Sequence, residues 1–538
     1  MAAGCVAFLY AAAQAARSYD VSGATLAGIS FWVELLLLVG TIIAGLRRGG
    51  FGFDFTFGSA RFATFAHAHT QGLFGTTGIR LGYFRHPAGG TARSPDGQPL
   101  PLHYTGERHL LTVAPTRAGK GVSTIIPNLL AHQGSAIIID PKGENARTTA
   151  RRRSQLGIGA WVLDPWGISG FKPARFNPLD MLKPDSPTLI EDATVIAEAL
   201  VIPETGGNGK HFSEQASDLI KGFLIYLAIM PGEVRTLGRL RAILTMPPKE
   251  LAQVGIAMAK SPHAIVRSAA AQFITKSETE RLGVLSTAQR NTHFLDSPAL
   301  QASLAASDFK FADLKGKEQL SIYLVLPVDR LTSHSRWLRL LIAQAIAELA
   351  RTPAKPPRPV LFMLDEFAQL GRMPIIEDAY GLMAGMGLQL HVIFQDLARA
   401  KRLYGEGWQT FAANAGVMQF FGTRDLFTAQ YVSSLIGMTT RTVRSSSTTS
   451  GSSSGTSGTQ HQSGSNSSSS VSFAPTQRPL LFPDELMRMD RNAQVLFVEN
   501  ADPVLADKIT WHEEADYRQL AGAQTLAALK AVHAPTKA

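Results

Sequence analysis

Short apolar runs alternate with stretches of helical periodicity along most of the chain after residue 100. A run of four to eight apolar residues is typical of a buried strand, and the helical stretches between such runs are typical of crossover helices. The pattern therefore predicts an α/β fold built on a parallel sheet. The expected strands are residues 110–114, 136–139, 160–163, 321–326, 360–364, 390–394, 417–421 and 495–498.

Helical periodicity dominates from residue 187 to residue 307, where few runs resemble strands. Phe212, Ala216, Leu219 and Phe223 recur every three or four residues, which gives a helix one apolar face. Pro248 marks an expected helix start, because proline is favoured in the first helical turn. We interpret this region as an all-α domain inserted into the α/β domain. The expected domain ranges are 49–186 and 308–500 for the two parts of the α/β domain, 187–307 for the insertion and 501–538 for a C-terminal tail.

An uninterrupted apolar run at residues 26–46 has about the 20 residues that span a bilayer. The arginine pair Arg47 and Arg48 follows it and predicts that the downstream chain lies in the cytoplasm. Glu34 inside the run is costly in lipid and indicates a helix partner; a buried core helix is the alternative. The apolar run at 2–16 is too short to span and is interpreted as the remainder of a longer helix. We expect residues 1–48 to form a membrane anchor.

Serine, threonine and glycine dominate residues 445–470. Such a composition buries too little apolar area to offset the entropy lost on ordering. It predicts a flexible surface loop.

The overall charge changes this picture only slightly. The chain carries 52 basic and 42 acidic residues, a formal net charge of +10, which permits an anionic partner such as nucleic acid or lipid headgroups. A plain solvated surface explains the same balance. Cys5 is the single cysteine, so an intramolecular disulfide and a cysteine-based zinc site are excluded.

The stretch "APTRAGKGVSTI" follows the first expected strand and resembles a phosphate-binding loop. The common pattern has glycine where this chain has Ala114, and a hydroxyl residue where it has Gly121. Alanine is acceptable at the first position if its φ angle is negative. Thr124 could replace the missing hydroxyl and reach magnesium through water, or could pack in the core. The expected nucleotide-binding residues are Ala114, Pro115, Thr116, Arg117, Ala118, Gly119, Lys120, Gly121 and Val122.

Polar residues at other strand ends complete a candidate ATP site. In "VLFMLDEFAQLG", Asp365 is placed to hold hydrated Mg²⁺ and Glu366 to polarise an attacking water. Gln395 ends another strand and is placed to position that water or sense the γ-phosphate, with simple capping as the alternative. Lys120, Glu366 and Gln395 are the expected catalytic residues. "IIIDPKGE" also places Asp140, Lys142 and Glu144 at a strand end, but their spacing indicates no chemistry.

In chain order these segments resemble the type IV coupling proteins, the membrane ATPases of conjugation and type IV secretion systems. The resemblance runs from about residue 26 to residue 500. It rests on the phosphate loop and on "GSARFAT", "IIIDPKGE", "VLDPWG", "FNPLD", "FMLDEFAQLG", "FQDLAR", "GTRDLFTAQYVSSLIG" and "RPLLFPDELMR". Glycine after the lysine is common in that family, so Gly121 fits it.

The resemblance implies a RecA-like P-loop nucleotide-binding domain, a homo-hexamer with ATP sites between subunits, and an arginine supplied in trans. Arg372 and Arg424 are the candidates for that arginine, with solvated surface positions as the alternative. The basic segment with Arg147, Arg151, Arg152 and Arg153 could face DNA phosphates or simply solvent.

The implied function is to recruit single-stranded DNA bound to a relaxase, or protein substrates, to the proteins of a type IV secretion channel at the inner membrane, using ATP. Two alternatives stay open: a membrane-anchored double-stranded DNA translocase, and a receptor that binds nucleotide without hydrolysing it.

Overall fold

The computed structural model describes residues 56–204, 207–352, 354–457 and 460–522. The expected membrane runs at 2–16 and 26–46 lie outside these residues. Among the residues that are described, no helix is both long and apolar enough to cross a membrane. The described chain divides into two compact units. One contains residues 56–60 and the segment Gly437–Leu480, and the other contains Arg61–Ile436 and the chain from Leu481 onward.

The larger unit is built on one mixed sheet of 11 strands. From one edge to the other the strand order is β2-β1-β13-β12-β9-β3-β8-β7-β4-β6-β5. The bounds are β1 Ile79–Phe84, β2 Pro101–Tyr104, β3 His109–Val113, β4 Ala136–Asp140, β5 Gly159–Leu163, β6 Leu320–Val325, β7 Val360–Leu364, β8 Leu388–Phe394, β9 Ala415–Phe420, β12 Ala493–Val498 and β13 Val504–Asp507.

All eight strands expected from the sequence are present, and those from β9 to β5 are parallel. Every residue of β3, β4 and β7 is buried, as is typical of parallel strands with both faces covered. The expected strand at residues 495–498 is present as β12 but lies outside the parallel part of the sheet. Strand β12 runs antiparallel to β9 and pairs with β13 through a short connection, which only antiparallel neighbours allow.

Three strands of this sheet, β1, β2 and β13, had not been expected. β1 contains Gly82 at φ +143°, and β2 begins at Pro101, so neither has an uninterrupted strand pattern. The C-terminal segment, expected to be only a tail, supplies β13 and the helix α19 (Ala515–Ala521). Residues 501–522 therefore belong to the sheet unit.

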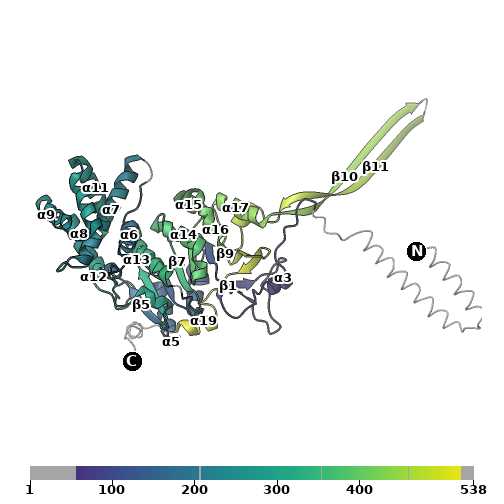
Figure 1. Cartoon of the computed structure of the whole chain (residues 1–538). Helices are drawn as coiled ribbons and strands as arrows, with labels where there is room; N and C mark the ends of the chain where they lie inside the picture. The colour runs from purple at the N-terminus through teal and green to yellow at the C-terminus, as the bar shows by residue number, and fades with distance from the viewer. Residues whose placement is uncertain (1–55, 205–206, 353, 458–459, 523–538) are drawn as a thin grey trace, which may run out of the picture. The chain divides into compact units, whose positions relative to one another are not determined.

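Helices cover the sheet (Figure 1). Their bounds are α3 Phe65–Thr70, α4 Ile126–Ala131, α5 Glu144–Gln155, α13 Leu331–Arg351, α14 Pro374–Leu382, α15 Leu397–Tyr404, α16 Gln409–Ala413, α17 Leu426–Ile436 and α18 Pro483–Met487. Short 3-10 helices occupy Pro178–Met181, His293–Asp296, Phe311–Lys315, Val328–Arg330, Phe367–Leu370, Ala384–Met386 and Gly405–Trp408.

Between Leu189 and Ser303 every described element is a helix, and these helices gather together in Figure 1. They are α6 Leu189–Leu200, α7 Gly207–Ile229, α8 Leu237–Leu244, α9 Pro248–Ala259, α10 Ala264–Thr275, α11 Glu278–Thr292 and α12 Pro298–Ser303. Helix α9 begins at Pro248. Of the apolar positions of α7 expected to face inward, Ala216, Leu219 and Phe223 are buried, whereas Phe212 is only partly buried. That these helices form a separate domain stays a prediction.

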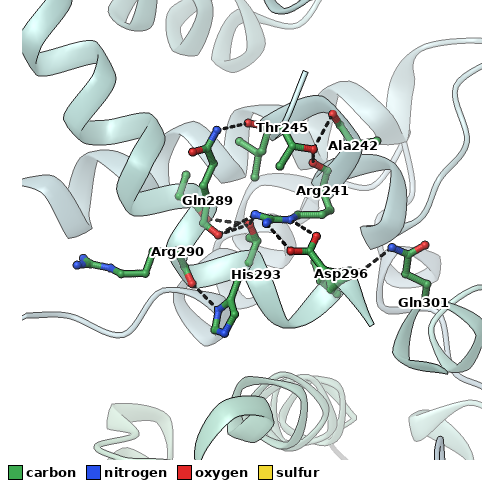
Figure 2. Close-up of polar contacts among 12 residues, drawn as sticks. Arg241, Ala242, Thr245, Gln289, Arg290, His293, Asp296 and Gln301 are labelled. Carbon is green, nitrogen blue, oxygen red and sulfur yellow. Dashed lines mark hydrogen bonds and ion pairs between the residues drawn. The ribbon is translucent and has the colours of Figure 1, made fainter. Parts of the chain in front are cut away.

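Arg241 of α8 ties this group together (Figure 2). Its guanidinium donates to both carboxylate oxygens of Asp296, each at 2.7 Å, and to the main-chain oxygen of Gln289 at 2.7 Å. The Gln289 side chain returns a bond of 2.7 Å to the carbonyl of Leu244. A planar group with five donors suits such a junction of three elements.

Arg339 of α13 makes a second, buried junction. Its guanidinium donates to the carbonyls of Leu370 and Arg372, each at 2.8 Å, and to Ala199 at 3.3 Å. Ala199 lies near the end of α6, whereas Leu370 and Arg372 follow β7. Helix α13 therefore connects the helical group with the segment that follows β7.

The smaller unit corrects the expectation of a loop at 445–470. Strands β10 (Met438–Ser457) and β11 (Gln460–Pro479) pair antiparallel in a continuous register from Met438 opposite Pro479 to Ser457 opposite Gln460. The expectation of a loop rested only on the small apolar area that the segment can bury. In a two-stranded ladder, however, the main-chain N–H and C=O groups bond to each other whatever the side chains are, and threonine favours strands.

Candidate nucleotide site

The candidate site lies at the carboxyl ends of three adjacent parallel strands. β8 lies between β3 and β7 in the sheet. The phosphate loop follows β3, Gln395 follows β8, and Asp365 and Glu366 follow β7. Polar groups from separate parts of the sequence thus meet at one sheet edge, where α/β proteins bind their ligands.

The main chain of the loop has the curvature of an anion-binding loop. Arg117 has φ +63° and Gly119 has φ +91°, both in the left-handed region. Ala114 does not, and its N–H donates to the carbonyl of Phe394 at 2.9 Å, so alanine fits this position as expected. Within the described part of the chain the Gly119 N–H has no hydrogen-bond acceptor. Such an unpaired main-chain donor is suited to a phosphate oxygen.

A helical segment begins directly after Lys120, as a π-helix over Gly121–Ile125 that continues into α4. Pro127 has no N–H to donate one turn back, which accounts for the irregular turn before it. The first turn of a helix leaves main-chain N–H groups free to face an anion. A side chain at Gly121 would meet no atom within 4 Å, so there is room beside the loop for a ligand or a hydrated cation.

Lys120 lies between the two acidic residues. Its Nζ is 2.8 Å from Asp365 Oδ1 and also contacts Glu366 Oε1. Burial alone lowers the pKa of Lys120, but the two carboxylates outweigh it and raise the pKa above its ordinary value. The lysine is therefore a cation at neutral pH. Glu366 has φ +51°, a strained conformation for a non-glycine residue and one that recurs at functional sites.

A chain of side-chain hydrogen bonds leads away from Glu366. Gln395 Nε2 donates to Glu366 Oε2 at 2.9 Å, and Arg399 Nη1 donates to Gln395 Oε1 at 3.2 Å. The side chain of Asp396 accepts from the Arg399 N–H at 2.6 Å and starts α15. Sequence reasoning missed Arg399, although its position four residues after Gln395, across a helix start, is the signal that could have identified it.

Thr124 packs in the core and is not placed to reach magnesium through water. Its side chain is 1% exposed, and its hydroxyl bonds to the side-chain oxygen of Gln419 at 3.3 Å. A hydroxyl held in the interior is not available to a hydrated cation. Gln419 in turn links Thr112 on β3 to Gln494 on β12 at 3.0 and 2.6 Å.

The two candidate trans arginines differ in their surroundings. Arg372 is held by Glu377, with Nε at 2.8 Å from the carboxylate. Arg424 is exposed, and the described part of the chain offers it no hydrogen bond or ion pair. Arg424 is thus the freer of the two.

The basic segment does not form one exposed face. It lies on α5, where Arg153 is fully buried and donates to Ser321 Oγ at 2.7 Å. Arg147 donates to the carbonyls of Ile168 and Lys142, each at 3.0 Å. Arg153 therefore braces the end of the helix, and the expectation of DNA contact was wrong for that residue.

Asp140 also has a structural role. Its carboxylate is 1% exposed and accepts the N–H of Ala146 at 2.8 Å, near the start of α5. Burial raises the pKa of Asp140 to about 6. Lys142 and Glu144 are exposed beside it.

A magnesium–nucleotide complex fits the residues present. Among the described residues no three histidine, cysteine or acidic side chains cluster as a metal site. Mg²⁺ on a nucleotide needs only one or two carboxylates, because phosphate oxygens and waters supply its other ligands. Asp365, 8% exposed beside Lys120, can supply that carboxylate.

A parallel sheet with a phosphate loop after one strand and an acidic pair after another defines a P-loop α/β protein. Within that class the chain belongs to the type IV coupling proteins. The model of the family Type IV secretory system Conjugative DNA transfer matches residues 83–534.

Curated relatives agree with this assignment. The chain is 29% identical over 494 residues to the Conjugal transfer protein TraG of Escherichia coli, covering 86% of this chain and 76% of that protein. It is 28% identical over 480 residues to Protein VirD4 of Agrobacterium fabrum, covering 86% of this chain and 67% of that protein.

Solved structures share the fold. The coupling protein TrwBdeltaN70 in complex with sulphate has a TM-score of 0.59 at 15% identity, covering 87% of this chain and 100% of that chain. TrwB in complex with ADP and Mg²⁺ has a TM-score of 0.58 at 15% identity, covering 84% of this chain and 100% of that chain.

Proposed function

We propose that this protein is a coupling ATPase, which hydrolyses ATP while recruiting relaxase-bound single-stranded DNA, protein substrates, or both to a type IV secretion channel. The proposal that ATP is hydrolysed rests on one observation. Lys120 contacts Asp365 and Glu366 at the sheet edge where Gln395 also lies. Membership of a conjugative DNA-transfer family supports the cargo.

In the proposed reaction, each side chain has a separate task. The N–H groups of the loop and the Lys120 ammonium bind the phosphates and neutralise charge that develops during transfer. Lys120 exchanges part of its contact with the carboxylates for contact with the phosphate, which frees Glu366 to accept a proton from water. Gln395, held by Arg399, orients the Glu366 carboxylate. Asp365 would hold Mg²⁺, which would supply further positive charge to the phosphates of the nucleotide.

The proposal includes a homo-hexamer with Arg424 completing the site of the neighbouring subunit. It also includes an inner-membrane anchor at residues 1–48, with the bulk of the chain in the cytoplasm. The exposed side chain of Arg424, which has no partner in the described part of the subunit, supports the first of these.

ATP turnover by the purified full-length protein tests the proposal, with and without single-stranded DNA. Glu366→Gln is the inactive control, because the amide keeps the shape of the side chain but cannot accept a proton. We expect turnover that rises with DNA and is lost in the control. Nucleotide binding with turnover equal to that of the control would instead establish a receptor that does not hydrolyse ATP.

A further inference from the structure

Lys508, near the C-terminal end of the described chain, donates a hydrogen bond to the phosphate loop. Lys508 directly follows β13 and is separated from the loop by about 390 residues of sequence. Its Nζ donates to the carbonyl of Ala118 in the loop at 3.2 Å, to that of Phe421 after β9 at 3.3 Å and to that of Arg491 at 2.9 Å. An ammonium has three N–H donors, so these three carbonyls use all of them.

The surroundings hold this ammonium in place. Its Nζ lies 4.3 Å from the centre of the Phe421 ring, within the range of a cation–π contact. The main-chain N–H of Lys508 donates to the Asn492 carbonyl at 2.7 Å. Arg491 donates in addition to the carbonyl of Arg117 in the loop at 3.3 Å. Two successive loop carbonyls are therefore fixed by cationic side chains from the C-terminal part of the chain.

The direction of these bonds matters for the loop's inner side. In a trans peptide the C=O and the following N–H point in opposite directions. Holding the Ala118 carbonyl against Lys508 therefore turns the Gly119 N–H away from Lys508. That N–H has no acceptor in the described part of the chain.

We propose that Lys508 is a positioning residue for nucleotide binding, which fixes the Ala118–Gly119 peptide so that the Gly119 N–H faces the phosphates. The inference rests on the proposed ATP site and extends it to a strand outside the parallel part of the sheet. Burial, reinforced by Arg491 and opposed by Asp490, lowers the pKa of Lys508 to about 8. The contacting segments also carry Arg117 in the loop and Asp507 directly before Lys508, and Asp507 is paired with Arg85 at 2.9 Å. Asp490 is itself held by Arg85 at 3.2 Å.

The test compares Lys508→Met and Lys508→Arg with Lys315→Met in the full-length protein. Lys315 is a matched control because its Nζ also caps carbonyls, those of Leu349 and Thr352 at 2.6 and 2.7 Å, without contacting the loop. Loss of charge-assisted hydrogen bonds is expected to raise the KM for ATP about tenfold in Lys508→Met, with kcat changed much less. Lys508→Arg should recover most of the loss, and Lys315→Met should leave KM unchanged.

A second readout needs neither turnover nor added nucleotide. Amide hydrogen exchange at residues 116–121 should be faster in Lys508→Met than in the wild type, and unchanged in Lys315→Met. Equal exchange in Lys508→Met and the wild type would overturn the inference even if ATP is hydrolysed. Faster exchange in Lys508→Met, together with a wild type that shows no ATP turnover, would support the positioning role of Lys508 and contradict the ATPase proposal. Failure of the inference and failure of the proposed function can therefore be told apart.

The wild type provides a third readout that needs no variant to fold. Loss of a proton leaves two donors for three carbonyls, so KM should rise as the pH passes 8. In Lys508→Arg the rise should disappear, because arginine stays charged. A wild-type KM that is flat from pH 7 to pH 9 would contradict the inference.

Discussion

The Gln395 amide donates a hydrogen bond of 2.9 Å to the Glu366 carboxylate, between the ends of two neighbouring strands. This contact predicts that Gln395 holds Glu366, the proposed general base, in position. Gln395→Ala should lower kcat for ATP about 10- to 100-fold with little change in KM, since the phosphate contacts remain. Steady-state ATPase kinetics measure both constants.

Gln430, exposed on α17, provides the control. Gln430→Ala should behave like the wild type. If Gln395→Ala keeps the kcat of the wild type, Gln395 has only a structural capping role.

Arg424 is predicted to act in a neighbouring subunit. Arg424→Ala should lower turnover about 1000-fold, the size of effect seen for arginines that complete phosphoryl-transfer sites, while nucleotide still binds. Arg372→Ala should have a smaller effect, because Arg372 is already paired with Glu377. Turnover and binding of a fluorescent ATP analogue separate the two cases.

Mixing subunits gives the decisive version of this test. Arg424→Ala subunits lack the arginine and Lys120→Ala subunits lack the loop lysine, so a ring made from both contains some complete sites only if Arg424 acts in trans. Recovery of activity on mixing is expected. If the two inactive variants assemble together and the mixed ring stays inactive, Arg424 does not act in the site of the neighbouring subunit.

Gly121 and Gly119 should respond oppositely to serine. Gly121 has ordinary φ and open space around an added Cβ, so Gly121→Ser should stabilise the protein by about 0.5 kcal/mol or leave it unchanged. Gly119 has φ +91°, so Gly119→Ser should destabilise it by about 1–3 kcal/mol and weaken nucleotide binding. Thermal melts and binding titrations measure both. A Gly121→Ser protein that loses nucleotide would show that the open space beside Gly121 is needed by the ligand.

Asp140 predicts a pH dependence of stability. Burial raises its pKa in the folded state to about 6, above the ordinary value of 3.8, so the folded state binds more protons between these pH values. The fold therefore loses stability as the pH rises through this range. A difference of about two pKa units corresponds to about 3 kcal/mol. Asp140→Asn keeps an acceptor for Ala146 but removes the titration, so it should gain relative to the wild type from pH 4 to pH 7. Urea midpoints across this range test it; a constant difference would contradict it.

The sequence predicted most strongly where one local pattern suffices. Strands buried on both faces, such as β4 and β7, are continuous apolar runs and were found almost to the residue. The phosphate loop and the acidic pair could be placed at the same edge because parallel strands end there together. Their residues Lys120, Asp365 and Glu366 do meet.

What the sequence did not reveal depends on partners far away in the chain. β1 and β13 are short strands that pair with each other although they lie at opposite ends of the described chain, and Gly82 interrupts the pattern of the first. The roles of Arg153 and Lys508 follow from carbonyls and hydroxyls contributed by distant segments. A charged residue in a sequence does not show whether its partner will be solvent, nucleic acid or main chain.

Arg339 links the helical group that follows β5 in the sequence to the segment that carries Glu366. One rigid, planar guanidinium holds the end of α6 and the turn that begins four residues after Glu366. Because the guanidinium is rigid, it cannot move with one of these carbonyls and keep its hydrogen bonds to the others unless they move too. If cargo bound to the helical group displaced α6, the turn that follows Glu366 would be displaced with it. A movement of that turn during ATP turnover would in the same way displace α6 and the bound cargo.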